Sequence, residues 1–153
     1  MIILIDSREQ QPFTFGDQIA TQKAALQTGD YSILGLENEV SVERKSLQDL
    51  IGSLGKGRDR FDRELDRLSK FHTRALVCEG SWAELIDGQY RGQMNPKAAY
   101  GSVMGIIAMG IPVVMANSRK GAERACYAIL RIAYNRWQWR LRNFAKGKIV
   151  KAS

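Results

Sequence analysis

The 153-residue chain predicts one α/β domain, a mixed central sheet with helices on both faces. Short apolar segments rich in β-branched residues alternate with longer segments in which apolar residues recur every three or four positions. A hydrophobic content of 44% at this length is enough for one sizeable core. We assign residues 1–145 to this domain and residues 146–153 to a basic tail that we expect to be flexible.

The first part of the chain is predicted to consist of strands. Residues 2–5 form a continuous apolar run that ends at Asp6 and the polar residues after it, as in a buried strand that leads into a loop. Residues 19–26 are mixed and favour a strand only weakly. Two later segments alternate like strands and are separated by a turn, which predicts a hairpin; they are residues 31–34 and 40–45.

The rest of the chain alternates between helices and strands. Ser46 is a good N-cap for a helix over residues 47–54, and Gly55 is suited to end it. A strongly charged helix is expected over residues 58–71. The remaining predicted elements are a strand at 75–79, a short helix at 81–87, an apolar segment with many small residues at 94–110, a strand at 112–116 and a long helix from Ser118.

Composition limits the classes of partner and of site. The formal net charge is +7, from 23 basic and 16 acidic residues, which favours a polyanion and nucleic acid first of all. No apolar run reaches the roughly eighteen residues of a spanning helix, and the first strand runs directly into charged residues. We therefore expect nucleic acid, and not a membrane surface, as the partner; the two cysteines described next indicate a cytoplasmic protein.

Cysteine and histidine are too few for several kinds of site. Cys78 and Cys126 are far apart in the chain and lie in apolar surroundings, as is typical of reduced core thiols. His72 is the only histidine, so a zinc site and a Ser-His-Asp triad both lack parts. We expect His72 to be a surface or capping residue.

The strand predicted at residues 40–45 carries the residues with the clearest chemical meaning. Glu43 and Lys45 are two positions apart and would project from the same face, whereas Arg44 would project from the other. The hairpin would bring Asp30 close to Glu43. Carboxylates favour Mg²⁺, with Mn²⁺ as a substitute, and a lysine can position a water and stabilise charge on phosphate. Hydrolysis of a phosphodiester needs these parts.

The same residues also have structural interpretations. Asp30 can be a simple turn residue, and residues 43–45 can belong to an exposed edge strand. Arg44 either pairs with Asp49 or another carboxylate, or acts in catalysis. Asp49 lies at the third position of the next helix, where a carboxylate is electrostatically favoured, and it stabilises the helix start, supports the site, or does both. For Arg8, a salt bridge and a phosphate contact are equally favoured.

Four motifs set these residues in a specific context. They are Ile5-Asp6-X-Arg8-Glu9, Gly29-Asp30-Tyr31, Val42-Glu43-Arg44-Lys45-Ser46-X-X-Asp49-Leu50-Ile51-X-Ser53-Leu54 and Gly57-Arg58. Together they resemble the nuclease domain of the XPF family of structure-specific endonucleases. The likeness continues through the strand at residues 75–79 and, more loosely, to about residue 133.

This resemblance implies a restriction-endonuclease-like core and metal-dependent cleavage of DNA that is branched or contains a junction between duplex and single strand. It also implies a role for each matching residue. The implied catalytic residues are Asp30, Glu43, Arg44, Lys45 and Asp49; Asp30 and Glu43 would bind the metal, Asp6 and Glu9 would bind it or support the site, and Arg58 would contact a phosphate.

Two departures from the family pattern affect substrate and partners. Family members commonly carry a C-terminal tandem helix-hairpin-helix module that grips DNA and dimerises, and this chain ends before such a module. A homodimer or a separate DNA-targeting partner is therefore expected. Glu64 stands where many relatives have glutamine.

Two alternatives to a DNA endonuclease remain open. One is a catalytically silent scaffold that binds branched DNA or a nuclease partner, and the other is an RNA-directed nuclease.

The C-terminal segment combines cations with aromatic residues. We expect a sequence-independent track of phosphate contacts, formed by Arg136, Arg140, Arg142, Lys146, Lys148 and Lys151. Trp137 and Trp139 either stack on unpaired bases or pack within the helix or a dimer, and the sequence favours packing. The helix with small residues around Gly101 and Gly105 is expected to pack on the sheet or on a second protomer, and the sequence does not decide between them.

Overall fold

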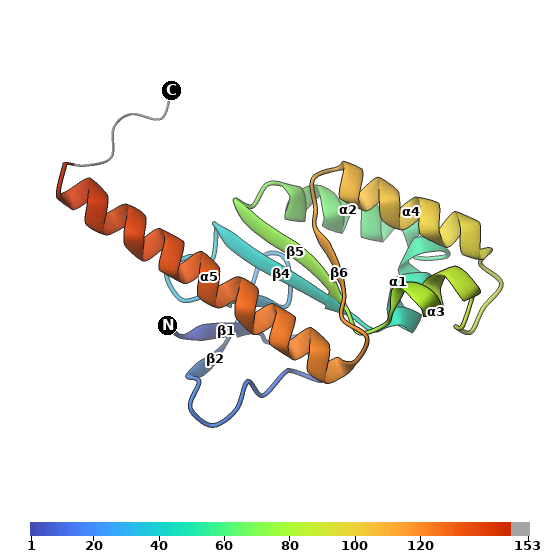
Figure 1. The fold of residues 1–153 in the computed structure, drawn as a ribbon, viewed down its shortest axis with the longest axis horizontal. Coiled ribbons are helices and arrows are strands. Elements are labelled where there is room, and N and C mark those ends of the chain that lie inside the picture. Colours follow the sequence, from blue (N-terminus) through green and yellow to red (C-terminus); the bar gives the residue numbers. More distant parts are fainter. Residues whose placement is uncertain (148–153) are drawn as a thin grey trace.

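The computed structural model describes residues 1–147, which form a six-stranded mixed sheet between two layers of helices (Figure 1). The strands are β1 (Ile3–Asp6), β2 (Thr21–Ala24), β3 (Tyr31–Ile33), β4 (Val40–Lys45), β5 (Thr73–Cys78) and β6 (Val113–Met115). The helices are α1 (Leu47–Leu54), α2 (Arg58–Ser69), α3 (Trp82–Asp87), α4 (Pro96–Ala108) and α5 (Arg119–Ala145). The predicted α/β fold with helices on both faces of a mixed sheet is confirmed.

The order and direction of the strands bring several strand ends to one edge of the sheet. The order is β2-β1-β3-β4-β5-β6; β3 is antiparallel to both β1 and β4, and β4, β5 and β6 are parallel to one another. The ends of β1, β4 and β5 therefore meet the start of β3. The Asp6 amide donates to the Asp30 carbonyl at 2.8 Å, and the Glu79 amide donates to the Lys45 carbonyl at 2.9 Å.

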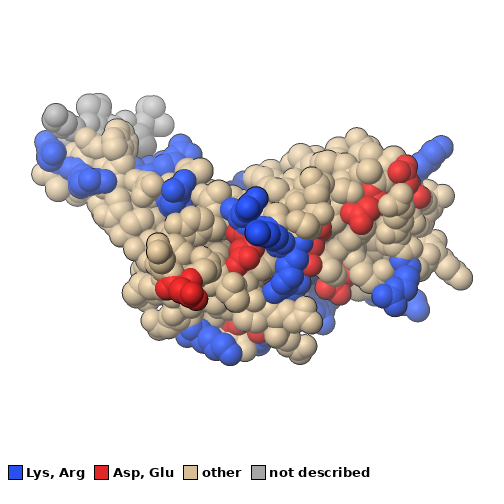
Figure 2. All heavy atoms as spheres, turned by 60° about the horizontal axis from the view of Figure 1, so that its bottom comes forward, with Lys and Arg blue, Asp and Glu red and all other residues tan. Residues whose placement is uncertain are grey.

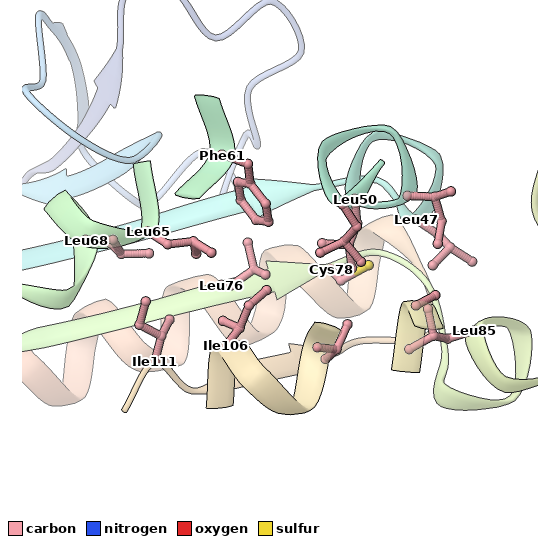
Figure 3. Packing of buried hydrophobic residues seen from close by; sticks show 14 residues of the cluster. Leu47, Leu50, Phe61, Leu65, Leu68, Leu76, Cys78, Leu85, Ile106 and Ile111 are labelled. Carbon is pink, nitrogen blue, oxygen red and sulfur yellow. The ribbon is translucent and has the colours of Figure 1, made fainter. Parts of the chain in front are cut away.

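The central strands are buried between two separate hydrophobic cores. On one face, Leu76 of β5 packs with Leu50 and with residues of α2 and α4, as Figure 3 shows. On the other face, Val77 of the same strand packs with Leu130 and other residues of α5. Successive residues of a strand point to opposite faces, so β5 serves both cores and is apolar on both sides. Cys78 and Cys126 are buried free thiols, one in each core, as predicted.

Local capping signals explain most helix boundaries. The Ser46 hydroxyl accepts a hydrogen bond from the Asp49 amide, and Gly55 ends α1 as predicted. The helix predicted over residues 58–71 ends earlier, at Ser69, because the Lys70 and Phe71 amides turn back to the carbonyls three residues before them. Within the described part of the chain, no helix has the length and apolarity needed to cross a membrane.

The glycines of α4 lie away from the sheet. A Cβ atom built on Gly101 or Gly105 meets no other atom within 4 Å, so neither glycine is a point of close approach to the sheet. The inner side of α4 is formed by Ala99, Val103 and Ile106, which pack in the same core as Leu76 of β5. Of the two partners predicted for the helix around Gly101 and Gly105, the sheet is therefore confirmed, although the contact is made by these apolar side chains and not by the glycines.

Candidate active site

An open cleft of about 700 Å³ lies at the edge of the sheet where the strand ends meet. Loops and helix starts at the carboxyl ends of parallel strands are common places for binding sites in α/β folds. Residues from β4, α1 and α2 and the residue after β5 line this cleft. Its carboxylates are Glu9, Asp30, Glu43, Asp49, Glu64 and Glu79, and its cations are Arg8, Arg44, Lys45 and Arg60.

Asp30 is placed at this edge by the backbone before β3. Gly29 has a φ of +79°, and a Cβ atom there would collide with the Ser41 side chain, so only glycine fits. The Asp30 amide then donates to the Val42 carbonyl at 2.9 Å, and the Asp30 carboxylate accepts from the Arg44 amide at 2.8 Å. These contacts hold Asp30 against β4, as the predicted hairpin requires.

Glu43 and Lys45 project from the same face of β4, as their spacing predicts. The Lys45 Nζ atom lies 2.9 Å from the Glu43 carboxylate and 3.6 Å from that of Glu64 on α2. It also lies 4.9 Å from the centre of the Phe61 ring, within the range of a cation–π contact. Lys45 is therefore fixed between β4 and α2.

Three carboxyl groups, those of Asp30, Glu43 and Glu64, surround the single ammonium of Lys45. Burial raises the pKa of Asp30 to about 6. Burial, followed by the Asp30 charge and a hydrogen bond with Glu64, raises the pKa of Glu43 well above its usual range. Burial alone would lower the pKa of Lys45, but Glu43 and Glu64 raise it above its ordinary value. The ammonium is therefore charged near neutral pH, and the site favours an additional cation.

Arg44 points to the opposite face of β4 and belongs to a different network. Its guanidinium lies 2.6 Å from the Glu79 carboxylate and 3.7 Å from that of Glu9. Arg119, at the start of α5, also reaches Glu79, at 3.0 Å. Of the predicted alternatives, the structure contains the pair with a carboxylate, and among Asp49 and the other carboxylates the partner is Glu79.

Asp6 and Arg8 form a bidentate ion pair at the end of β1. Both oxygens of Asp6 accept hydrogen bonds from the Arg8 guanidinium, at 2.8 and 2.9 Å, and the Leu26 amide donates to one of them at 2.9 Å. The Arg8 side-chain hydrogen bond outweighs burial and lowers the pKa of Asp6. The predicted salt bridge of Arg8 is present, while 72% of the Arg8 side chain stays exposed at the rim.

The other predicted site residues lie at different distances from this centre. Asp49 is exposed on the cleft wall, and its carboxylate accepts from the Ser46 hydroxyl at 2.7 Å. The Glu9 carboxylate accepts from the Gln11 amide at 2.8 Å. Arg58 pairs with Asp62 at 2.9 Å on the outside of α2. Figure 2 shows acidic and basic side chains crowded together in the middle of the face turned forward.

The predicted C-terminal contacts are far from this cleft. Arg136, Arg140, Arg142 and Lys146 lie on the end of α5 that projects past the sheet, opposite the ends of β4 and β5 (Figure 1). Lys148 and Lys151, with the rest of the predicted tail from 148 onward, lie outside the described residues. The Trp137 side chain packs on the core under α5, whereas Trp139 is 62% exposed. Trp137 therefore packs as the sequence favoured, whereas the Trp139 side chain is largely exposed to solvent.

Several charged residues of the site were not predicted. Glu79 directly follows a buried strand, and the rule that sites lie at strand ends would have identified it. Glu64 lies three positions after the buried Phe61, on the side of α2 that faces the sheet. Arg60 and Arg67 line a second opening to Asp30 and Glu43, and no sequence signal distinguishes them from the other α2 arginines. Among residues 1–147, no three acidic, cysteine or histidine side chains form a ready-made metal-binding group.

Comparison with known proteins identifies the family. The model of the ERCC4 domain matches residues 5–125, from β1 into α5. The chain belongs to the ERCC4 domain family. The resemblance predicted from the sequence motifs is thereby confirmed, and the matched range contains the whole cleft. The last twenty residues of α5 lie beyond it.

Solved structures show how far the fold of this ERCC4 domain is shared. XPF from Aeropyrum pernix matches with a TM-score of 0.69 and 23% identity, over 87% of this chain and 61% of that one. XPF from Aeropyrum pernix in complex with DNA matches with a TM-score of 0.68 and 21% identity, over 93% of this chain and 72% of that one. The chain thus spans 61% of the first structure. No curated protein sequence matches.

Proposed function

We propose that this ERCC4 domain is a divalent-metal-dependent endonuclease that hydrolyses phosphodiester bonds of DNA at branches or at junctions between duplex and single strand. The observation that carries the proposal is the cluster of Asp30, Glu43 and Lys45 in one cleft, where carboxylates outnumber the single ammonium. Membership of the ERCC4 family and the DNA in the complex of XPF from Aeropyrum pernix support DNA as the substrate.

The side chains beside Lys45 fit a hard divalent cation. Asp30 is a partly buried and Glu43 a buried carboxylate, and burial raises the pKa of both; for Glu43 the Asp30 charge adds to this rise. Mg²⁺ is often held by only one or two carboxylates together with waters, so a ready-made cluster of three protein ligands is not needed. We propose Mg²⁺, with Mn²⁺ able to replace it. When bound, the ion would supply an acidic water and neutralise charge on the phosphate.

The residues of the chain itself would orient the reacting groups. Lys45, fixed by Glu43, Glu64 and Phe61, would place a positive charge beside the phosphate and orient the attacking water. Arg44 and Glu79 would keep the end of β4 in place from the other face. The side chains of Asp6, Glu9 and Asp49 would support the site, and the rim cations would contact neighbouring phosphates.

A second copy of the chain or a separate DNA-targeting partner would complete the grip on DNA. Three exposed apolar side chains, Tyr100, Ile107 and Met109, belong to α4 and the residue after it. Tyr100 and Ile107 are seven residues apart and share one side of the helix, whereas Met109 points about 180° away from Tyr100. We propose the side of α4 that carries Tyr100 and Ile107 as the surface for that contact. We also propose that the protein works inside the cell, where its DNA substrates are.

A panel of labelled fork, flap and linear duplex DNA tests the proposed function. Mg²⁺ should support cutting of the fork or flap, and EDTA should abolish it. Glu43→Gln keeps the shape of the side chain and removes its charge, so this variant should bind the substrates without cutting them. Metal-independent binding with no cutting of any substrate by the native protein would instead establish a silent scaffold. Faster cutting of matched RNA would establish an RNA-directed nuclease.

A further inference from the structure

The outward face of α5, near its C-terminal end, presents an exposed aromatic ring between cations. The Trp139 side chain is 62% exposed and that of Ile132 is 54% exposed. They are seven residues apart, which places them within about 20° of each other around the helix. Together with Asn135, Arg136 and Arg140 they line a shallow depression of about 530 Å³. The C-terminal part of α5, which carries these residues, projects away from the ends of β4 and β5 (Figure 1).

The cations around Trp139 are not balanced by carboxylates. Residues 124–153 contain eight Lys or Arg and no Asp or Glu. Figure 2 likewise shows only cationic side chains among the charged groups at the projecting end of α5. The Arg140 guanidinium lies 3.2 Å from the His72 ring nitrogen and 5.6 Å from the centre of the Trp137 ring. Neither the His72 ring nor the Trp137 ring carries a negative charge, so the positive charge of Arg140 stays uncompensated by these contacts and the face suits a polyanion.

Two other occupants fit this face less well. In a symmetric dimer the same patch meets itself, so contact through this face would place cations against cations. A helix that lies in a membrane surface needs its large apolar side chains on one side. The exposed rings of Trp139 and Phe144 are five residues apart and point about 140° away from each other around the helix.

We propose that this face binds single-stranded nucleic acid, with Trp139 stacking on an unpaired base and Arg136, Arg140 and Arg142 contacting phosphates. Sites for single strands combine exposed aromatic rings with a positively charged surface that follows the backbone. Duplex bases are already stacked on each other and leave no free face for Trp139. The site is separate from the cleft, so it adds a single-strand contact to the proposed nuclease and does not depend on cleavage.

Binding measured without metal isolates this site from catalysis. Fluorescence anisotropy with labelled twenty-nucleotide oligo-dT in EDTA should show binding by the full chain, and Trp139→Ala should weaken it by about fivefold or more, as expected for loss of one stacked base. Matched duplex DNA should be affected by less than twofold. An oligo-rU of the same length establishes whether the site accepts RNA as well as DNA.

The matched control is Phe144→Ala, which removes an even more exposed ring from a different side of the same helix. It should leave oligo-dT affinity unchanged. Equal losses in both variants, or no loss with Trp139→Ala, would overturn the proposal. It would also be overturned if Trp139→Ala reduced only binding to vesicles of phosphatidylserine and phosphatidylcholine, or only the sedimentation mass of the protein. Because both side chains are exposed, circular dichroism should show intact folding.

The salt dependence of binding tests the phosphate contacts separately. For single strands, each neutralised phosphate adds about 0.7 to the slope of log affinity against log salt. Arg136→Gln should lower that slope by about this amount. An unchanged slope would remove Arg136 from the site. Because these measurements are made in EDTA, they report single-strand binding whether or not the protein cuts DNA, so loss of cutting and loss of single-strand binding can be told apart.

Discussion

Burial makes the ionised Asp30 carboxylate unfavourable in the folded protein without metal. Its pKa rises from 3.8 to about 6, so between these values the folded state binds a proton that the unfolded state has released. The stability associated with this proton is present below about pH 4 and is lost as pH rises through about 6. A difference of about two pKa units corresponds to about 3 kcal/mol.

Asp30→Asn removes the charge and keeps an oxygen that can accept from the Arg44 amide. In EDTA at about pH 8, this variant should resist urea unfolding better than the native protein by up to about 3 kcal/mol, and the gain should disappear near pH 4. Exposed Asp17→Asn serves as the control and should change stability little at either pH. Equal stability of Asp30→Asn and the native protein at pH 8 would refute the reasoning.

Magnesium should act in the opposite direction. If Asp30 is a ligand, the ion binds the native folded state and stabilises it by mass action. Added Mg²⁺ should therefore raise the urea midpoint of the native protein and have little effect on Asp30→Asn. A midpoint that rises equally in both proteins would remove Asp30 from the metal site.

Three further variants test the site and the core. Lys45→Ala should abolish cutting in the junction panel and leave substrate binding in EDTA largely intact; undiminished cutting would remove Lys45 from the mechanism. Gly29→Ala should lower the free energy of unfolding by at least about 1 kcal/mol more than Gly35→Ala does. Both glycines have a positive φ, but only Gly29 lacks room for a Cβ atom. Equal losses of the two variants in urea unfolding would contradict this. Leu76→Ala should destabilise by about 2–5 kcal/mol in the same assay, and a loss below about 1 kcal/mol would contradict the packing described for β5.

The parts of the fold that depend on local signals were predictable. Ser46 caps the amide of Asp49, three residues later, and Gly55 directly follows the last residue of α1. Both signals are local, so the bounds of α1 could be predicted from the sequence. The period of two along β4 likewise predicted that Glu43 and Lys45 share a face. The hairpin then required Asp30 to lie nearby, and the Arg44 amide does donate to its carboxylate.

The parts that depend on distant residues were not predictable. Arg44 meets Glu79, thirty-five positions later, and Arg119 reaches the same carboxylate from α5. The spacing of residues in the sequence also does not reveal which carboxylate oxygens already accept hydrogen bonds in the folded protein. Asp6 carries a carboxylate at the right edge, yet Arg8 and the Leu26 amide already bond both of its oxygens. The outward position of Gly101 depends on how α4 packs on the sheet, which small residues alone do not determine.

The length of α5 sets the distance between Trp139 and the end of the helix that lies beside the cleft. Arg119 at its start contacts Glu79 beside the cleft, and Trp139 is twenty residues further along. Twenty helical residues span roughly 30 Å. No proline interrupts this stretch, so the spacing is fixed by one continuous helix. A strand held at Trp139 would meet the cleft roughly nine base pairs of duplex away, at about 3.4 Å per pair. The helix would then act as a ruler that sets the cut position, and inserting one helical turn between Trp137 and Trp139, beyond the residues that pack on the core, would shift that position.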